Sequence, residues 1–372
     1  MPERRIDTNN APMVVFGLGV QFQDCYPQLV LALGREPDFL CDNAQEKWGR
    51  QFFGRTCISP ADLAGLGKNI SVVITIRRYE DVFRQLRALG IQNIFVACYD
   101  QGYDVIHCIK KLGTEDSAHP EEPFINPVKE KWTLVTGASR GIGRQIALAM
   151  AGLGSNIIAH SRELEHTKEV VNACRAIGVH AEPIAAELGH LDELEEILDK
   201  LEHFPEPIEI IFNNAGISQP CGPDIWNISS EKYLAHYIVN TIAPIRICYR
   251  LIPPMIQRGF GRVINISSTI QKTPSGMAYA CSKAALSKFV HDMAPSLEGT
   301  GVMMSLVCPG YVRSDMGGAN APHPVESVIP GALLGAVMDG DVNGRFFIAQ
   351  DYAGLGLTDA MKRAQFYYSQ EG

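Results

Sequence analysis

Apolar and polar residues alternate along this chain in the order expected of a protein built from strands and helices in turn. Short apolar runs of strand length occur in the second half, at 132–137, 155–162, 208–216, 262–268, 302–310 and 343–349. Between them lie segments with apolar residues at helical spacing, as at 191–204 and 230–257. Buried strands that alternate with helices predict an α/β fold with a doubly wound parallel sheet, the Rossmann fold.

The first half repeats this pattern on a smaller scale. Its strand candidates are 13–19, 38–43, 70–76 and 93–100, and a helix that ends at a glycine covers 81–90. The two halves are separated by residues 113–130, which are rich in proline and acidic residues and have no apolar period. We therefore expect a smaller Rossmann-like domain over 1–112, a linker over 113–130 and a larger domain over 131–372.

The composition is that of an ordinary globular protein, and it narrows the range of partners. Of the 372 residues, 46% are hydrophobic and 20% are charged, and the formal net charge is −8. This charge argues against nucleic acid or an anionic membrane as a partner. The polar start and the lack of a membrane-spanning apolar run favour a cytoplasmic protein. The ten cysteines are scattered without CxxC pairs, which predicts reduced thiols and no metal site.

The segment Thr136–Gly143 has the features of a phosphate-binding turn. It follows a strand candidate and precedes a helix. Its glycines let the backbone approach a pyrophosphate, and free N–H groups at the helix start attract negative charge. A plain tight turn is the alternative, but the strand before and the helix after it favour dinucleotide binding. The cofactor-binding residues expected here are Gly137, Ser139, Arg140, Gly141, Ile142 and Gly143.

The charges near this turn indicate which dinucleotide binds. An adenosine ribose with free hydroxyl groups is usually held by an acidic residue at the end of the second strand. Here that strand ends in His160, Ser161 and Arg162, and Arg140 lies inside the glycine turn. Two guanidinium groups suit a 2′-phosphate, so we expect NADP(H) rather than NAD(H), although Glu163 is an acidic residue close by.

Tyr279 and Lys283 are four residues apart, so on a helix they share one face. A free tyrosine has a pKa of about 10 and is a poor base at neutral pH. Lowering this pKa to about 7 takes roughly 4 kcal/mol of preferential stabilisation of the phenolate. A neighbouring ammonium group can supply much of that energy. By itself the spacing is more often a solvated helix face, so its meaning depends on the motifs around it.

Five motifs occur in order along the second half of the chain. They are TGASRGIG at 136–143, NNAG at 213–216, a serine pair at 267–268, YACSK at 279–283 and PG at 309–310. Together they resemble the short-chain dehydrogenase/reductase family, over about residues 130–372. The resemblance implies an NADP(H)-dependent oxidoreductase that interconverts a ketone or aldehyde and an alcohol by hydride transfer.

The resemblance also implies a role for each matching residue. Tyr279 is the expected proton donor or acceptor, and Lys283 lowers its pKa and binds the nicotinamide ribose. Ser268 binds the substrate oxygen, with Ser267 as the alternative, and Asn240 holds a water molecule in the proton relay. Further cofactor contacts are expected from Ser161, Arg162, Asn214, Ala215, Gly216, Pro309, Gly310, Val312 and Ser314. Glu187 stands where the family usually has an aspartate near the adenine.

The first half carries an incomplete dinucleotide fingerprint. Gly17 and Gly19 follow the first strand, but Phe22 stands where a third glycine is expected, which argues against a nicotinamide dinucleotide. Asp42, at the end of the second strand, either binds a ribose or forms an Asx turn. Residues 12–110 resemble the Rossmann-like N-terminal domains of polysaccharide- and sugar-modifying proteins, some of which bind nucleotide sugars. Nucleotide-sugar binding, dimerisation and a degenerate scaffold are the three alternatives for this half.

The whole chain is therefore compatible with three functions. The favoured one is NADP(H)-dependent interconversion of a small carbonyl compound and an alcohol, with a sugar or nucleotide-sugar derivative as substrate. The first alternative is a reductase of small carbonyl or acyl substrates whose first domain serves oligomerisation. The second is an NADP(H)-sensing regulatory protein without turnover, against which the complete set of Asn240, Ser268, Tyr279 and Lys283 argues. By analogy with the family, a homodimer or homotetramer is expected.

Overall fold

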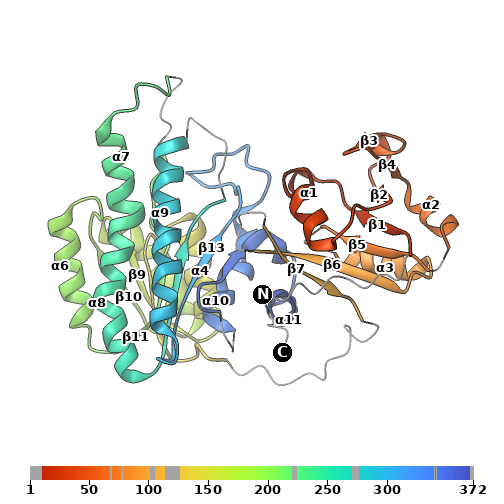
Figure 1. The fold of residues 1–372 in the computed structure, drawn as a ribbon. Coiled ribbons are helices and arrows are strands. Elements are labelled where there is room, and N and C mark those ends of the chain that lie inside the picture. Colours follow the sequence, from red (N-terminus) through yellow and green to blue (C-terminus); the bar gives the residue numbers. More distant parts are fainter. Residues whose placement is uncertain are drawn as a thin grey trace. The chain divides into compact units, whose positions relative to one another are not determined.

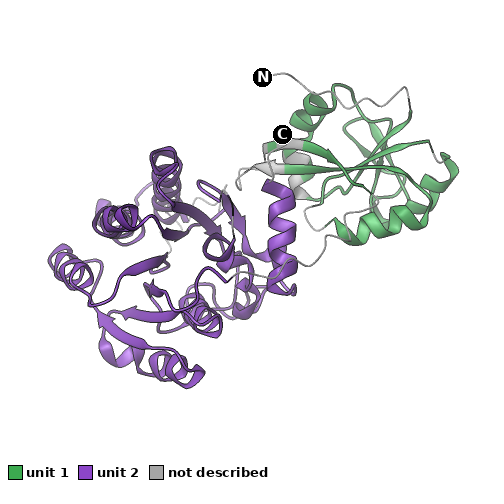
Figure 2. Cartoon of the chain, turned by 90° about the horizontal axis from the view of Figure 1, so that it is seen from below, with its two compact units in different colours: residues 1–123 green, residues 124–372 purple. Residues whose placement is uncertain are grey.

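The computed structural model of this protein describes residues 11–67, 69–76, 79–100, 105–113, 126–219, 224–269, 276–338, 340 and 342–368. The chain forms two compact units, residues 1–123 and 124–372 (Figure 2). Most of the stretch expected to be a linker lies outside the described residues. Val128, near the end of that stretch, is buried in the hydrophobic core of the second unit.

The described part of the first unit contains one sheet of seven strands, in the order β3-β4-β2-β1-β5-β6-β7 (Figure 1). These strands are β1 (Met13–Phe16), β2 (Phe39–Cys41), β3 (Gln51–Phe52), β4 (Arg55–Ile58), β5 (Ser71–Ile74), β6 (Asn93–Asp100) and β7 (Val105–Lys111). The pairs β3–β4 and β6–β7, at the two edges, are antiparallel, and the pairs between them are parallel. The unit is thus the smaller α/β domain that was predicted.

Helices connect the parallel strands of this sheet. They are α1 (Val20–Leu33), the 3-10 turn η1 (Gln45–Lys47), α2 (Pro60–Gly65) and α3 (Glu80–Ala88). The sequence pattern predicted β1, β2, β5, β6 and α3, but it did not predict β3, β4 or β7. These three strands lie at or next to the sheet edges, and they mix polar with apolar residues because edge strands are less completely covered.

The turn after β1 is held in place by residues of the same unit. Asp42, which follows β2, accepts hydrogen bonds from the backbone N–H groups of Leu18 (2.6 Å) and Ala44 (2.9 Å). Lys47 donates from Nζ to the Asp42 carboxylate (2.9 Å) and to the Leu18 carbonyl (3.0 Å). Phe22 lies in the hydrophobic core. Of the two interpretations of Asp42, its contact with Ala44 is that of an Asx turn, and Leu18 and Lys47 occupy the rest of its carboxylate.

The described part of the second unit contains a sheet of seven parallel strands, in the order β10-β9-β8-β11-β12-β13-β14. These strands are β8 (Trp132–Val135), β9 (Asn156–Ser161), β10 (Ala181–Ala185), β11 (Ile208–Asn213), β12 (Gly261–Ile266), β13 (Val302–Cys308) and β14 (Phe346–Ile348). This arrangement confirms the predicted doubly wound sheet.

The helices of the second unit are α4 (Gly141–Gly152), α5 (Lys168–Ile177), α6 (Leu191–Glu202), α7 (Ser230–Tyr237), α8 (Ala243–Arg258), α9 (Met277–Met293), α10 (Leu334–Val337) and α11 (Leu357–Tyr368). Its 3-10 turns are η2 (Leu164–Thr167), η5 (Ala294–Leu297), η6 (Val325–Val328), η7 (Gly331–Leu333) and η8 (Ala349–Tyr352). The long helical region predicted around 230–257 contains a π-helical turn, η3 (Ile238–Ile242), between α7 and α8.

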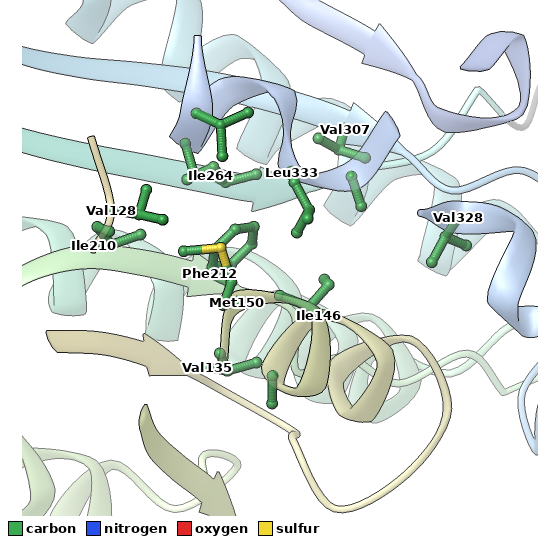
Figure 3. Close-up of a cluster of buried hydrophobic side chains, with 14 of the residues drawn as sticks. Val128, Val135, Ile146, Met150, Ile210, Phe212, Ile264, Val307, Val328 and Leu333 are labelled. Carbon is green, nitrogen blue, oxygen red and sulfur yellow. The ribbon is translucent and has the colours of Figure 1, made fainter. Parts of the chain in front are cut away.

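A hydrophobic core covers each face of this sheet. On one face, Ile146 and Met150 of α4 pack with Phe212 of β11 (Figure 3). On the other, Leu198 of α6 packs with Ile211 of β11. Since successive side chains of a strand point to opposite faces, Ile211 and Phe212 serve different cores. Both faces of the sheet are therefore covered, as the continuous apolar strand sequences predicted.

The strand order reverses between β8 and β11, which are neighbours near the middle of the sheet. In doubly wound sheets, the ligand crevice lies outside the carboxyl ends of the strands at this point. The glycine turn follows β8, and the NNAG motif begins at the end of β11. Among the described helices, none combines the length and the apolar character that a membrane crossing requires.

Candidate active site

The sequence motifs of the second unit gather at the carboxyl edge of its sheet. The glycine turn follows β8, the NNAG motif ends β11, the serine pair follows β12, and Pro309 and Gly310 follow β13. Tyr279 and Lys283 lie on α9, which packs against α7 and η3 (Figure 1). Because parallel strands end at the same edge, segments far apart in the sequence converge on one region.

The hydroxyl group of Tyr279 is hydrogen-bonded to the side chain of Ser268. Burial raises the pKa of Tyr279 to about 12, the Ser268 bond acts in the opposite direction, and Cys308 adds to the rise. The sequence led us to expect that Lys283 would lower this pKa. In this structure the pKa is raised instead, because the cost of burying the phenolate dominates. At neutral pH, Tyr279 therefore carries its proton.

The two adjacent serines have different surroundings. Ser267 is buried, and its hydroxyl group contacts that of Ser287 at 2.7 Å. Ser268 is half-buried and bonds Tyr279. Both serines were candidates for the partner of Tyr279 in the sequence. In the structure, Ser268 is the one that is hydrogen-bonded to Tyr279.

Lys283 is almost completely buried, with an exposed fraction of 4%. Its Nζ donates a hydrogen bond of 2.6 Å to the carbonyl group of Ile266, at the end of β12. Burial lowers the pKa of Lys283 to about 8, so the ammonium form still predominates at neutral pH. A side-chain carbon added at Gly216 would lie 3.6 Å from this Nζ and 3.1 Å from Asn240 Oδ1. Lys283 therefore lies between the end of β12 and the NNAG motif.

Asn240 lies in the π-helical turn η3 and joins three segments. Its Oδ1 accepts from the Ile217 N–H (2.8 Å), and its Nδ2 donates to the Ile217 carbonyl (2.9 Å) and to Ser282 Oγ (3.0 Å). Ser282 in turn donates to the Tyr279 carbonyl at 2.7 Å. The Asn240 side chain thus connects the NNAG loop to the helix that holds Tyr279. Single π-helical turns of this kind are frequent at functional sites.

The glycine turn is packed too tightly for side chains. Gly137 has a φ of +65°, and a side-chain carbon at Gly143 would lie 2.2 Å from the Gly137 carbonyl oxygen. Asn214 braces the turn, since its Nδ2 donates to the carbonyls of Thr136 (2.8 Å) and Gly137 (3.2 Å). The Ala215 N–H donates to Thr136 Oγ1 at 3.0 Å. Residues that follow β8 and β11 thus hold the turn jointly.

Arg140 forms an ion pair with Asp315, with 2.8 Å between Nε and Oδ2. Both side chains are well exposed. Gly141 approaches the same segment, because a side-chain carbon at Gly141 would lie 3.7 Å from Cβ of Ser314. The Ser314 hydroxyl group accepts the Gly317 N–H at 3.1 Å. The segment after β13 therefore borders the glycine turn.

The second arginine expected at the 2′-phosphate also has an acidic neighbour. Arg162, which follows β9, lies 4.0 Å from Glu187 Oε2, and 60% of its side chain is exposed. Glu187 Oε1 accepts the Gly189 N–H at 3.1 Å. Ser161 is buried, and its hydroxyl group donates to the Glu163 carbonyl at 2.5 Å. Arg140 and Arg162, the two arginines that the sequence indicated, thus both present exposed guanidinium groups at this edge of the sheet.

The remaining predicted contacts lie in and around the segment after β13. Gly310 has a φ of +77°, and Gln350 donates to the Pro309 carbonyl at 2.9 Å. Val312 is buried in the core beside α4 and pairs through its backbone with His323. In the glycine turn itself, Ser139 is half-buried and Ile142 packs against the same core.

Two residues of the site were not among the predicted functional residues, although Ser282 lies inside the YACSK motif. Ser282 lies one helical turn after Tyr279 and bonds both Asn240 and the Tyr279 carbonyl. His160 is buried at the end of β9, where its ring contacts Gly137 and Ala186. A lone histidine inside an apolar strand was the signal that a buried polar partner must exist, but the sequence did not show which one.

Residues 131–324 match the family described as short chain dehydrogenase. The chain is 36% identical over 205 residues to a short chain dehydrogenase of Pseudocercospora fijiensis, a match that covers 53% of this chain and 64% of that protein. It therefore spans slightly less than two thirds of that relative. It is 30% identical over 225 residues to an NADPH-dependent aldehyde reductase-like protein of Arabidopsis thaliana, with coverage of 57% and 83%.

A solved structure of a metagenomic short-chain oxidoreductase in complex with NADP is also similar to this chain. The two are 28% identical and superpose with a TM-score of 0.51. The match covers 58% of this chain and 96% of the other. The family match over residues 131–324 lies within the second unit, where the motifs also lie.

Proposed function

We propose that this chain, which belongs to the short-chain dehydrogenase family, interconverts a carbonyl compound and an alcohol with NADP(H). The observation that carries the proposal is the hydrogen bond between Tyr279 and Ser268, on the edge of the sheet where the glycine turn lies. A phenol and a hydroxyl group that face each other at a dinucleotide site are suited to hold a carbonyl oxygen and give it a proton.

The glycine turn fits a dinucleotide. Gly143 has no room for a side chain because it lies against the Gly137 carbonyl and Asn214, so the start of α4 packs directly on the turn. We propose that this turn, Asn214 and Lys283 hold NADP(H), with Arg140 and Arg162 at the 2′-phosphate. When bound, NADPH supplies the hydride that adds to the carbonyl carbon, and NADP takes it up in the reverse direction.

The protein has to supply the proton. Tyr279 is protonated at neutral pH, because burial holds its pKa at about 12, and it is therefore ready to donate to a carbonyl oxygen that Ser268 also binds. The charged Lys283 on the same helix stabilises the phenolate that this donation leaves. These properties favour reduction as the direction in which the resting site is prepared to act.

We propose that Asn240 closes a proton relay. The side chain of Asn240 already forms hydrogen bonds with Ile217 and Ser282. In this proposal the water molecule of the relay therefore donates to the main-chain carbonyl group of Asn240. Pro244, four residues further on, has no N–H group. The carbonyl of Asn240 therefore has no α-helical donor and is available to a water molecule.

The substrate is a small carbonyl compound or the corresponding alcohol. A sugar or nucleotide-sugar derivative was favoured from the resemblance of the first unit. Two observations support the alternative of a simpler carbonyl substrate: the similarity to an aldehyde reductase-like protein, and the engagement of Asp42 within its own unit. In that case the first unit serves as a scaffold or in oligomer formation.

Turnover by the 372-residue chain tests the proposal. The protein is mixed with NADPH and a panel of aldehydes, ketones and keto sugars, and NADPH oxidation is followed. Tyr279→Phe is expected to lower turnover by about 100-fold or more, because the proton donor is lost, while NADPH binding measured by fluorescence stays the same. Tyr367→Phe is the matched control, since Tyr367 is a half-buried tyrosine of α11 that lies outside the motifs.

Each result separates the candidate functions. Unchanged turnover in Tyr279→Phe would rule out the proposed mechanism. NADPH binding without reduction of any member of the panel would favour the regulatory alternative. A keto sugar as the best substrate would support the sugar-derived assignment, whereas a simple aldehyde or ketone would support the alternative.

We also propose a homodimer or homotetramer that pairs through η3, α8 and α9. Ile242, Tyr249 and Ile256 are apolar side chains with exposed fractions of 39%, 54% and 38% on η3 and α8. Burying them in a second copy would remove apolar surface from water. Size-exclusion chromatography with light scattering measures the mass of the protein in solution. A monomer at micromolar concentration would contradict this assembly.

A further inference from the structure

His160 is a buried histidine that the proposed chemistry does not use. It lies at the end of β9 with an exposed fraction of 2%. Its Nδ1 accepts a hydrogen bond from the Gly137 N–H at 3.3 Å, and its Nε2 lies 3.1 Å from the Ala186 carbonyl oxygen. A carbonyl oxygen only accepts and an N–H only donates, so the ring carries its proton on Nε2 and is neutral. Both ring nitrogens are therefore occupied.

The contact with Gly137 completes the fixation of both backbone polar groups of this residue. The Gly137 N–H is bound by His160 from β9, and the Gly137 carbonyl is bound by Asn214 Nδ2 from the end of β11. The His160 carbonyl also accepts the Ala138 N–H at 2.8 Å. The glycine turn is thus held from the strands on both sides of β8. The N–H group of Gly137 is directed into the protein and is not available to a ligand.

The contact with Ala186 extends this hold to the second arginine of the site. Ala186 precedes Glu187, whose carboxylate lies 4.0 Å from Arg162. Arg162 itself comes two residues after His160. One imidazole ring therefore ties the turn expected to bind the pyrophosphate to the residues expected to bind the adenosine end.

We propose that His160 is a positioning residue of the cofactor site: as a neutral Nε2–H imidazole, it sets the glycine turn and the end of β10 in register for NADP(H). This inference rests on the proposed function. It adds a residue that acts through Gly137 and Ala186, without touching the cofactor or the substrate itself.

Three substitutions separate the two hydrogen bonds. His160→Leu removes both. His160→Asn retains an acceptor at the position of Nδ1, so it preserves the Gly137 bond. His160→Gln retains a donor at the position of Nε2, so it preserves the Ala186 bond. His203→Leu is the matched control, because His203 is exposed after α6.

The dissociation constant of NADPH is measured by fluorescence titration of variants of the 372-residue chain, and turnover is measured at saturating NADPH. His160→Leu is expected to raise the dissociation constant about tenfold, the effect of leaving one buried N–H group unpaired. Turnover at saturation is expected to stay within about threefold of the wild type, because Tyr279 and Ser268 are untouched. His160→Asn is expected to recover more of the affinity than His160→Gln.

Two other results would overturn the inference. One is a folded His160→Leu protein whose NADPH affinity equals that of the wild type. The other is a loss of affinity in all three variants that merely follows their loss of thermal stability, with no recovery by His160→Asn. A wild-type protein that does not bind NADPH would instead refute the proposed function, so the two failures are distinguishable. Nitrogen-15 spectra of the imidazole check the geometry independently, since a ring that titrates like a free histidine would contradict the assigned tautomer.

Discussion

The guanidinium group of Arg140, in the glycine turn, is paired with the carboxylate of Asp315 at 2.8 Å. Arg140 lies between β8 and α4, whereas Asp315 belongs to the segment after β13. The ion pair therefore joins two loops that are far apart in the sequence. Arg140 is also one of the two arginines proposed to bind the 2′-phosphate. The charge of Arg140 is therefore already shared with a carboxylate.

We predict that Asp315→Asn increases the preference for NADPH over NADH. The substitution removes a negative charge that competes with the 2′-phosphate for Arg140. Because the pair is exposed, the gain is expected to be about two- to fivefold. Dissociation constants for both dinucleotides, measured by fluorescence or calorimetry, give the ratio. Asp359→Asn, at the start of α11, is the control, and an unchanged or lower ratio would contradict the prediction.

Gly143→Ala is expected to destabilise the second unit and weaken cofactor binding. The new methyl group would lie 2.2 Å from the Gly137 carbonyl oxygen and 2.4 Å from Asn214 Nδ2, so backbone has to move. The expected loss is about 1–3 kcal/mol of unfolding free energy, as for other overpacked sites. Gly152→Ala, in the same helix, meets no atom within 4 Å. It should be neutral or stabilising by up to about 1 kcal/mol, and equal effects at both positions would refute the packing argument.

Pro244→Ala is expected to slow turnover without weakening NADPH binding. Alanine restores an N–H group four residues after Asn240, and that group can occupy the Asn240 carbonyl proposed to bind the relay water. We expect a several-fold fall in turnover at saturating NADPH and an unchanged dissociation constant. Pro254→Ala, within α8, is the control. A Pro244→Ala protein with wild-type turnover would show that this carbonyl does not take part.

The stability contribution of Lys283 should depend on pH in a defined direction. Burial lowers its pKa to about 8, from an ordinary value of 10.5. Below pH 8 both folded and unfolded chains bind the proton, and the full cost of burying the charge is present. Between about pH 8 and 10.5 only the unfolded chain binds it, so unfolding free energy rises with pH. The complete change is about 3 kcal/mol, at about 1.4 kcal/mol per unit.

Denaturation of wild type and Lys283→Met at several pH values measures this contribution. The unfolding free energy of the wild type is expected to increase relative to that of Lys283→Met as the pH rises from 7 to 10. Lys288→Met removes an exposed lysine from the same helix and should show no such trend. A constant difference between wild type and Lys283→Met would mean that the lysine is not desolvated.

In the first unit, Asp42→Asn is expected to destabilise the turn after β1. The Asp42 carboxylate accepts from Leu18 and Ala44 and pairs with Lys47. Burial raises the pKa of Asp42, but these three contacts together outweigh it and lower the pKa below its usual value. The substitution is expected to cost about 1–3 kcal/mol in unfolding free energy. Asp81→Asn, at an exposed carboxylate of α3, is the control, and a change no larger than the control's would contradict the assigned role.

The sign of the Asp42 effect with pH follows from the lowered pKa. The carboxylate stabilises the fold above the ordinary pKa of an aspartate, and this contribution is lost as the pH falls through the lower pKa of the folded state. The difference in stability between wild type and Asp42→Asn should therefore shrink in acid. A difference that grows in acid would mean that the carboxylate is not stabilised by its neighbours.

Much of the second unit was predictable from the sequence because its signals are local. Apolar strands covered on both faces read as continuous runs, and the glycines at 137, 141 and 143 are required where the backbone itself has to come close. The motifs occur in the order in which the strands end at one edge. This local information was sufficient for the doubly wound fold and for the candidates Tyr279, Ser268 and Lys283.

The tertiary structure decided the features that depend on surroundings. Whether burial or a neighbouring charge controls the pKa of Tyr279 depends on how much water reaches it, which no spacing reveals. The partners of His160, Asp42 and Arg140 come from other strands, brought near only when the sheets form. Period and residue type are properties of neighbouring positions in the chain, so the sequence by itself determined the elements and the chemical groups. Burial and pairing are properties of the packed molecule, so only the fold determined what those groups contact and in which protonation state they rest.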